Sequence, residues 1–123
     1  MQSLTKAEEQ VMQALWQIES GFAQDIWQAL PEPKPAYNTA LTIVRILEKK
    51  GFVDFEVFGK SHRYFPKVSK KEYSENLLGD VAKNYFNNSF KSIVSFFADN
   101  QNITLKDLKE IELFLEQRTK SKE

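Results

Sequence analysis

The chain has 123 residues, of which 41% are hydrophobic and 28% charged, and its 17 basic side chains equal its 17 acidic ones. This composition is typical of a folded globular chain and excludes wholesale disorder. No apolar run approaches the roughly 18 residues that a membrane helix needs, and no export signal precedes the first helical pattern. The absence of cysteine excludes a disulfide scaffold and a thiolate metal site. We therefore expect a cytoplasmic protein without direct membrane binding.

The first 50 residues predict three helices. Thr5 and Glu8 form a capping-box pattern ahead of an apolar helical stripe, which predicts a helix over residues 5–19. A short helix follows over residues 23–30, and the three prolines of residues 31–35 force a turn. Residues 37–50 then predict a third helix, whose apolar positions recur at helical spacing up to Gly51.

The apolar period changes to two after Gly51. Residues 52–58 and 62–68 are rich in β-branched and aromatic side chains, and residues 59–61 separate them, which predicts a β-hairpin. Pro66 restricts the second strand to an edge, or marks its end. Three helices followed by a hairpin is the order of a winged helix-turn-helix. The predicted fold class is therefore mainly α with a small β-hairpin wing.

The rest of the chain predicts three amphipathic helices, with capping patterns at Ser69 and Thr104 and a break over residues 87–90. A helical piece of about 55 residues buries too little apolar surface to be stable alone, and a second copy related by two-fold symmetry would cover it. We therefore predict a winged helix-turn-helix DNA-binding domain over residues 1–68 and a helical homodimerisation domain over residues 69–123. The predicted dimer interface comprises Leu77, Leu78, Val81, Phe86, Phe90, Ile93, Val94, Phe97, Leu108, Ile111 and Leu115.

The third helix starts with polar side chains, and the hairpin turn is basic. A recognition helix reads base edges through its first turns, while neighbouring elements and the wing hold phosphates. Asparagine can pair bidentately with adenine, and a threonine methyl can meet that of thymine. The predicted contacts with double-stranded DNA are Tyr37, Asn38, Thr39, Thr42, Arg45, Lys60, Ser61, His62 and Arg63.

Simpler interpretations remain open for several of these residues and for the two lysines at the end of the third helix. Asn38 and Thr39 could cap the third helix, Lys49 and Lys50 could be a solvated helix end, and Arg63 could pair with Glu56. The zero net charge also opposes DNA binding, because nucleic-acid binders usually have a basic excess. The segment from Arg45 to Lys67, however, has six cations against three acids.

Nothing in the sequence predicts catalysis, a cofactor or a metal. His62 is the only histidine, so it lacks the partners that a metal site or a catalytic triad needs. The four glycines are spread out and form no phosphate-binding loop. The aromatic residues of 84–97 could line a ligand pocket, but their helical spacing favours interface core.

Three blocks of this sequence resemble the BlaI/MecI/CopY penicillinase-repressor family. "LTKAEEQVMQALW" from Leu4 is similar to the family's opening helix, "AYNTALTIVRILEKKGFV" from Ala36 to its recognition helix, and "GKSHRYFPKVSKKEY" from Gly59 to its wing and the lead into its dimerisation helices. The blocks come in the family's order, and the resemblance covers nearly the whole chain.

The resemblance implies a cytoplasmic, homodimeric winged-helix repressor on a palindromic operator. It also implies relief of repression by a membrane sensor protease of the β-lactam response, which cuts the dimerisation region near Phe96 and Phe97. Well-known members have Asn before Phe at this bond. At position 41, some members have Arg where this chain has Leu41, so the operator sequence does not carry over. Copper-responsive members have a cysteine motif that this chain lacks.

Two other classes of function stay open at this stage. One is a winged-helix protein-interaction module, which keeps the fold and loses the basic surface. The other is a regulator that responds to a small ligand bound among the C-terminal aromatic side chains.

Overall fold

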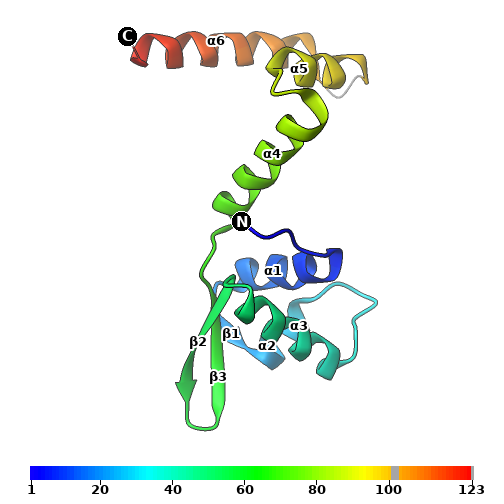
Figure 1. The fold of residues 1–123 in the computed structure, drawn as a ribbon, viewed down its shortest axis with the longest axis vertical. Coiled ribbons are helices and arrows are strands. Elements are labelled where there is room, and N and C mark those ends of the chain that lie inside the picture. The colour runs from blue at the N-terminus through cyan, green and yellow to red at the C-terminus, as the bar shows by residue number, and fades with distance from the viewer. Residues whose placement is uncertain (101–102, 123) are drawn as a thin grey trace. The chain divides into compact units, whose positions relative to one another are not determined.

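The computed structural model describes residues 1–100 and 103–122. Over these residues the chain forms six helices and one three-stranded antiparallel sheet, in the order ααα, hairpin, ααα once a very short strand is set aside (Figure 1). This confirms the predicted fold class. The chain divides into two compact units, Met1–Leu77 and Leu78–Glu123, and each is described by itself below.

Helix α1 (Lys6–Ile18) begins as the sequence predicts. The Glu8 backbone N–H donates to Thr5 Oγ1 at 3.2 Å, and the Thr5 N–H donates to Glu8 Oε1 at 2.7 Å, so the capping box is complete. The helix ends before Glu19, which has a φ of 71°.

Strand β1 (Gly21–Phe22) was not predicted, because two residues are too short to show a period of two. It pairs with strand β3 (Ser61–Pro66), with Gly21 opposite Tyr64 and Phe22 opposite Arg63. A Cβ on Gly21 would lie 2.9 Å from Ile18 Cδ1 and 3.0 Å from the Asp25 Cβ, so a larger residue here would crowd both side chains.

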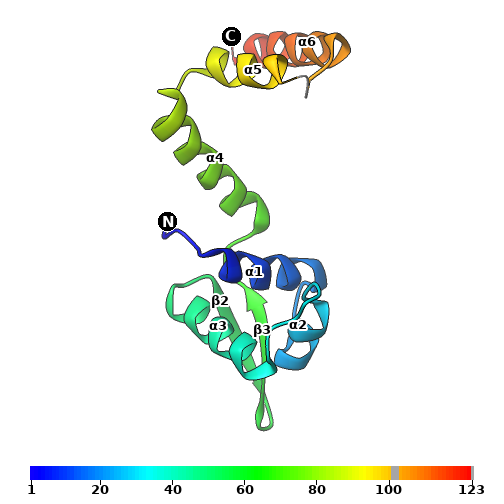
Figure 2. The same ribbon diagram turned by 90° about the vertical axis from the view of Figure 1, so that its right-hand side faces the viewer.

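Helices α2 (Ala23–Ala29) and α3 (Tyr37–Lys49) confirm the second and third predicted helices within a residue at each end. Strand β2 (Val53–Phe58) and β3 form the predicted hairpin, with a two-residue turn in which Gly59 has a φ of 62°. The sheet order β1-β3-β2 makes β3 the central strand, and Pro66 stands at its end. Figure 2 shows α1 across α2 and α3, with the hairpin extending from them.

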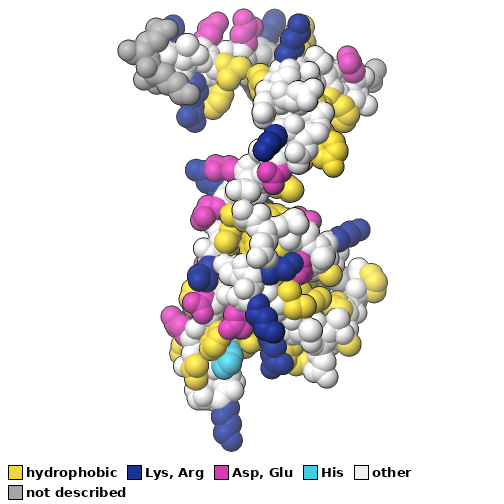
Figure 3. Space-filling model, in the orientation of Figure 1, with side chains coloured by type: hydrophobic (Ala, Val, Ile, Leu, Met, Phe, Trp, Pro, Cys, Tyr) yellow, Lys and Arg dark blue, Asp and Glu magenta, His cyan; other side chains and the backbone are white. Residues whose placement is uncertain are grey.

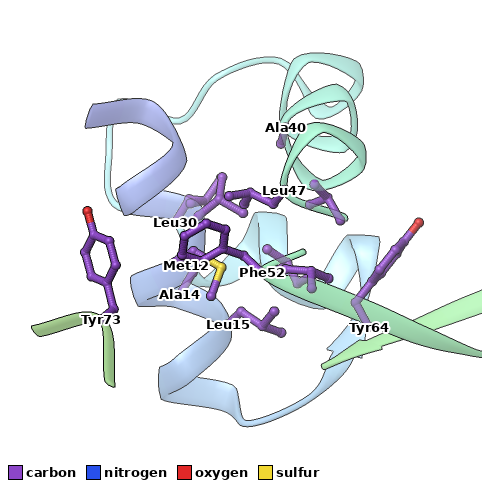
Figure 4. Packing of buried hydrophobic residues seen from close by; sticks show 13 residues of the cluster. Met12, Ala14, Leu15, Leu30, Ala40, Leu47, Phe52, Tyr64 and Tyr73 are labelled. Atoms are coloured by element: carbon purple, nitrogen blue, oxygen red, sulfur yellow. The ribbon is translucent and has the colours of Figure 1, made fainter. Parts of the chain in front are cut away.

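A single apolar core joins these elements (Figure 4). Each helix and the hairpin contribute side chains that are almost fully buried, among them Met12, Leu15, Ile26, Val44, Leu47, Phe52 and Val53. Tyr64 and Tyr73 close the two ends of the cluster with their hydroxyl groups pointing outward. Burying a Val, Leu or Phe side chain contributes about 1.5–3 kcal/mol, so this cluster dominates the stability of the first unit.

The first turns of helix α4 (Lys70–Phe86) belong to this core. Tyr73 is 8% exposed and its hydroxyl donates to Glu9 Oε2 at 3.0 Å. Burial, and next the Glu9 carboxylate, raise the pKa of Tyr73 to about 12. The Trp16 indole N–H donates to the Val68 carbonyl at 2.9 Å, which holds the segment that leads into α4.

One partly buried ion pair links the start of α1 to the end of α3. Lys50 Nζ lies 2.9 Å from Glu8 Oε1, and Glu8 is only 5% exposed. The backbone hydrogen bond from Thr5, and then Lys50, outweigh burial and lower the pKa of Glu8. The interpretation of Lys50 as a solvated helix end was therefore wrong.

The described residues of the second unit form helices joined by short turns, without a strand. Helix α4 ends at Phe86, where Asn87 and Asn88 have φ values of 51° and 59°, and this confirms the predicted break. Ser89 caps helix α5 (Phe90–Asp99), and Thr104 with Asp107 caps helix α6 (Leu105–Lys122). No helix in residues 1–100 or 103–122 is long and apolar enough to cross a membrane.

The first prediction concerns Glu8. Because its pKa is lowered on folding, the carboxylate stabilises the protein above its ordinary pKa of 4.5, and this contribution is lost as the pH falls through the lowered folded value. Glu8→Gln should therefore lower the free energy of unfolding at pH 7 by about 2 kcal/mol. Urea denaturation between pH 3 and pH 7 should also show that the free energy of unfolding of Glu8→Gln falls less steeply with decreasing pH than that of the wild type. The exposed Glu56→Gln variant is the control, and an unchanged acid limb in Glu8→Gln would contradict the assignment.

Candidate nucleic-acid interface

Helix α3 has one buried and one exposed face. Ala40, Val44 and Leu47 are at most 3% exposed and hold the helix against the core. Because side chains three or four positions apart share a face, this burial turns the rest of the helix outward. The exposed polar side chains are Asn38, Thr39, Thr42, Arg45 and Lys49.

Asn38 and Thr39 do not cap α3. The N-cap residue is Ala36, which makes no side-chain cap, and the described residues include no hydrogen-bond partner for either side chain. Thr42 Oγ1 donates to the Asn38 carbonyl at 2.9 Å, an ordinary bond within the helix. The capping interpretation was wrong, and the two side chains are available for an external partner.

An open cleft of about 360 Å³ separates α3 from the hairpin. It brings together five of the predicted DNA-binding residues, Tyr37, Arg45, Lys60, Ser61 and His62. Asn38, Thr39 and Thr42 lie on the exposed face of α3 outside its lining. The cleft also has lining residues that were not among the predicted DNA contacts, namely Phe22, Ala23, Gln24, Leu41 and Tyr64.

These additional residues were missed for identifiable reasons. Phe22 and Gln24 reach the cleft because β1 pairs with β3, a contact between segments about 40 positions apart. Leu41 follows Tyr37 by four residues and precedes Arg45 by four, so helical spacing alone places the three on one stripe. That spacing was the one signal in the sequence that could have found Leu41.

Arg63 does not line this cleft. It lies opposite Glu56 and Phe22 in the sheet, and neighbouring residues of a strand point to opposite faces. Its side chain therefore leaves the hairpin on the face opposite to His62 and Tyr64. The described residues include no ion pair between Arg63 and Glu56, so the alternative interpretation of Arg63 as part of a surface pair was wrong.

The His62 ring is held by aromatic neighbours. It stacks on Phe55 with ring centroids 4.1 Å apart and planes 8° apart, and it meets Tyr64 edge-on at 6.1 Å. Within the described part of the chain, no three His, Asp or Glu side chains gather where a metal ion could bind. The structure therefore presents His62 as a fixed flat side chain of the wing.

The charges around the cleft differ from those of the whole chain. Its lining residues include the cations Arg45 and Lys60 and no carboxylate. Figure 3 shows a basic side chain at the end of the hairpin, with the histidine above it. Two acids of α1 are occupied elsewhere, since Glu8 pairs with Lys50 and Glu9 accepts from Tyr73. The zero net charge therefore does not describe this surface.

Tyr64 connects the cleft to the core. Burial, and next the nearby Glu48 carboxylate, raise the pKa of Tyr64, while the Arg45 guanidinium opposes this shift. Tyr64 is 4% exposed and lines the cleft together with Arg45.

The predicted dimer-interface residues are uncovered in a single chain. Leu77, Leu78, Phe90, Phe97 and Leu115 are 41–67% exposed. Val81, Phe86, Ile93, Val94, Leu108 and Ile111 are partly exposed. None of these side chains is buried, although α5 and α6 have apolar stripes. Phe96, at the predicted cleavage bond, is 47% exposed.

A three-helix unit with an exposed polar recognition helix and a basic wing defines the class of winged helix-turn-helix DNA-binding proteins. Residues 4–117 match the model of the penicillinase repressor family, so the chain belongs to that family. It is a transcriptional repressor and not an enzyme, which decides against the protein-interaction module.

A solved structure described as the CopR repressor is 25% identical to this chain. The match covers 55% of this chain and 100% of the CopR chain, with a TM-score of 0.46. No curated protein sequence matches.

The second prediction tests the exposed face of α3. Removing an N-cap side chain costs about 0.5–2 kcal/mol. Since Asn38 and Thr39 make no cap, Asn38→Ala and Thr39→Ala should change the free energy of unfolding by less than about 0.5 kcal/mol. Thr5→Ala, which removes a cap that the structure shows, is the matched positive control. Thermal unfolding followed by circular dichroism measures all three, and a loss in Asn38→Ala as large as in Thr5→Ala would contradict this view of α3.

Proposed function

We propose that the protein is a homodimeric repressor that covers a palindromic operator with two winged helices. Residues 1–68 would bind DNA and residues 69–123 would join the two copies. The observation that carries the proposal is the exposed, uncapped entrance of α3 beside a cleft with cations and no carboxylate. Repression would be steric, with the two recognition helices about 34 Å apart or a multiple of that distance.

In this proposal the residues divide into two roles. Asn38, Thr39 and Thr42 read base edges, because they occupy the first turns of α3 and their side chains are exposed. The cleft and wing residues hold the DNA backbone, namely Tyr37, Arg45, Lys60, Ser61 and His62. Arg63 contacts a phosphate on the other side of the wing, because its side chain leaves the opposite face of the hairpin.

The third prediction separates the two roles. Arg45→Ala and Lys60→Ala should weaken binding to duplexes of any sequence, and each should reduce the slope of log affinity against log salt by about one. Asn38→Ala should leave that slope unchanged and alter which sequences a random duplex library yields. Lys71→Ala, in an exposed ion pair on α4, is the matched control. Fluorescence anisotropy across a salt series measures this, and an unchanged slope in both cation variants would refute the proposed interface.

The exposed apolar side chains of the second unit support the homodimer. An isolated helical piece gains little stability when its apolar stripes stay in water. A second copy would bury the same residues on both chains around a two-fold axis, and this arrangement is the commonest for homo-oligomers. We therefore propose that Leu77, Leu78, Phe90, Phe97, Leu115 and the partly exposed members of the set form the dimer contact.

The fourth prediction tests this contact. Phe90→Asp places a charge in the proposed interface and should weaken the dimer by at least about tenfold, since a buried unpaired charge is costly. Ser95→Asp introduces the same charge on α5 outside the proposed set and should leave the dimer unchanged. Sedimentation equilibrium measures both, and a wild-type chain that stays monomeric at micromolar concentration would refute the homodimer.

We further propose that repression is relieved by proteolysis between Phe96 and Phe97, under the control of a membrane sensor protease. The two rings are exposed and lie 5.3 Å apart within α5. The Phe96 carbonyl, which belongs to this bond, accepts from the Asn100 N–H at 3.1 Å and from Asn100 Nδ2 at 2.7 Å. A protease would therefore need the last turn of α5 to open first.

The fifth prediction follows from this protected carbonyl. Asn100→Ala removes one of its two hydrogen bonds and should speed chymotrypsin cleavage after Phe96 by about fivefold, because a lost hydrogen bond favours the open state by about 1 kcal/mol. Asn84→Ala, exposed on α4, is the control.

The proposed cleavage can also be tested in cells. Mass spectrometry of repressor recovered from cells treated with a β-lactam should show a fragment that starts at Phe97. Intact repressor under induction would refute relief by cleavage.

A further inference from the structure

Two side chains at the α2–α3 connection, Trp27 near the end of α2 and Lys34 in the loop, make contacts that the proposed DNA interface does not include. Trp27, on α2, donates its indole N–H to the Pro35 carbonyl at 2.8 Å. Lys34, within the loop, donates its ammonium to the Gln28 carbonyl at 2.9 Å and to the Leu30 carbonyl at 2.5 Å. The ammonium of Lys34 also lies 5.7 Å from the centre of the Trp27 ring.

These contacts meet at the start of the recognition helix. Ala36 is the N-cap of α3 and has no side-chain cap, so no local hydrogen bond of the usual kind fixes where the helix begins. Trp27 contacts the residues on both sides of Ala36. Its N–H holds Pro35, and its ring meets the Tyr37 ring edge-on at 6.4 Å with the planes 74° apart.

The position of the start of α3 affects the cleft, because residues of one stripe of this helix line it. Tyr37 lines the cleft together with Leu41 and Arg45, which follow it at intervals of four residues. A shift at the first residue of a helix moves every residue on that stripe, because a helix is a stiff element. Asn38 and Thr39 lie in the same first turn, so they would move as well.

We propose that Trp27 is a positioning residue for DNA recognition, and that Lys34 supports it. Through Pro35 and Tyr37, Trp27 sets how the first turn of α3 meets base edges, without contacting DNA itself. This inference rests on the proposed function, since it assigns a role in reading sequence to a side chain outside the proposed interface. It concerns specificity, so loss of Trp27 should affect specific binding more than phosphate binding.

The chain contains a matched control for this test. Trp16 is also partly buried, and its indole N–H also donates to a backbone carbonyl, that of Val68, at 2.9 Å. Its ring contacts Tyr73 and its hydrogen-bond acceptor lies just before α4, so it does not bind the residues on either side of Ala36. Trp16→Phe and Trp27→Phe therefore remove the same kind of hydrogen bond and keep an aromatic ring, but only Trp27→Phe acts on the entrance of α3.

The experiment selects duplexes from a random library with the full-length wild-type chain and then measures two affinities for each variant. One is for the selected duplex and the other is for poly(dI-dC), both at the same salt concentration and well below each thermal midpoint. Trp27→Phe should lower the ratio of the two affinities about tenfold, the effect of about one hydrogen bond. Affinity for poly(dI-dC) should stay unchanged, and Trp16→Phe should keep the wild-type ratio. Lys34→Met provides a second variant and should lower the ratio in the same direction.

Three outcomes would overturn the inference. A wild-type ratio in both Trp27→Phe and Lys34→Met would remove the positioning role. Equal losses in Trp27→Phe and Trp16→Phe would mean that general loosening of the fold, and not the entrance of α3, controls specificity. A wild-type chain that enriches no sequence would overturn the proposed function and this inference with it. In the first two cases the wild-type chain still enriches a sequence, so the inference alone is overturned and the proposed function stands.

Discussion

The burial of one face of α3 is the constraint on which the recognition surface depends. Ala40, Val44 and Leu47 enter the same core as α1 and Phe52, and each is nearly inaccessible to water. A helix whose apolar stripe is buried cannot rotate without exposing that stripe, at a cost of about 1.5–3 kcal/mol for each Val or Leu. The polar stripe therefore has to face outward. The Glu8–Lys50 pair adds a second restraint, because it joins the end of α3 to the start of α1.

The distribution of charge follows from the same packing. A chain with equal numbers of acids and bases can still present a cationic surface if its acids have partners elsewhere. Glu8 and Glu9 accept hydrogen bonds from Lys50 and Tyr73, and the cleft between α3 and the wing has Arg45 and Lys60 without a carboxylate. Net charge is a property of composition, whereas binding to phosphates depends on the local arrangement.

The two units differ in how they satisfy their apolar side chains. The first buries Tyr64 and Tyr73 at the two ends of a continuous core (Figure 4). In the second, the α5 helix has a clear apolar stripe and no buried residue. This contrast is the physical reason for proposing that the second unit is completed by another copy of the chain, while the first needs DNA only for its function.

The sequence by itself determined the helices, the β-hairpin and the family. Capping boxes at Thr5, Ser69 and Thr104, the change of apolar period after Gly51, and the break before Ser89 are local signals, and local signals can be read from neighbouring residues. The matched motifs extended this to the class of DNA-binding repressors.

Only the tertiary structure decided which side chains meet. The pairing of β1 with β3, the contact of Glu8 with Lys50, and the hold of Trp27 on Pro35 join residues whose relation depends on packing in three dimensions. The same packing showed that Asn38 and Thr39 do not cap α3, and it placed Arg63 on the face of the hairpin opposite to His62. The reason is that spacing along the chain shows which side chains share one face of a helix or strand. What that face contacts depends on how all the elements pack in the core.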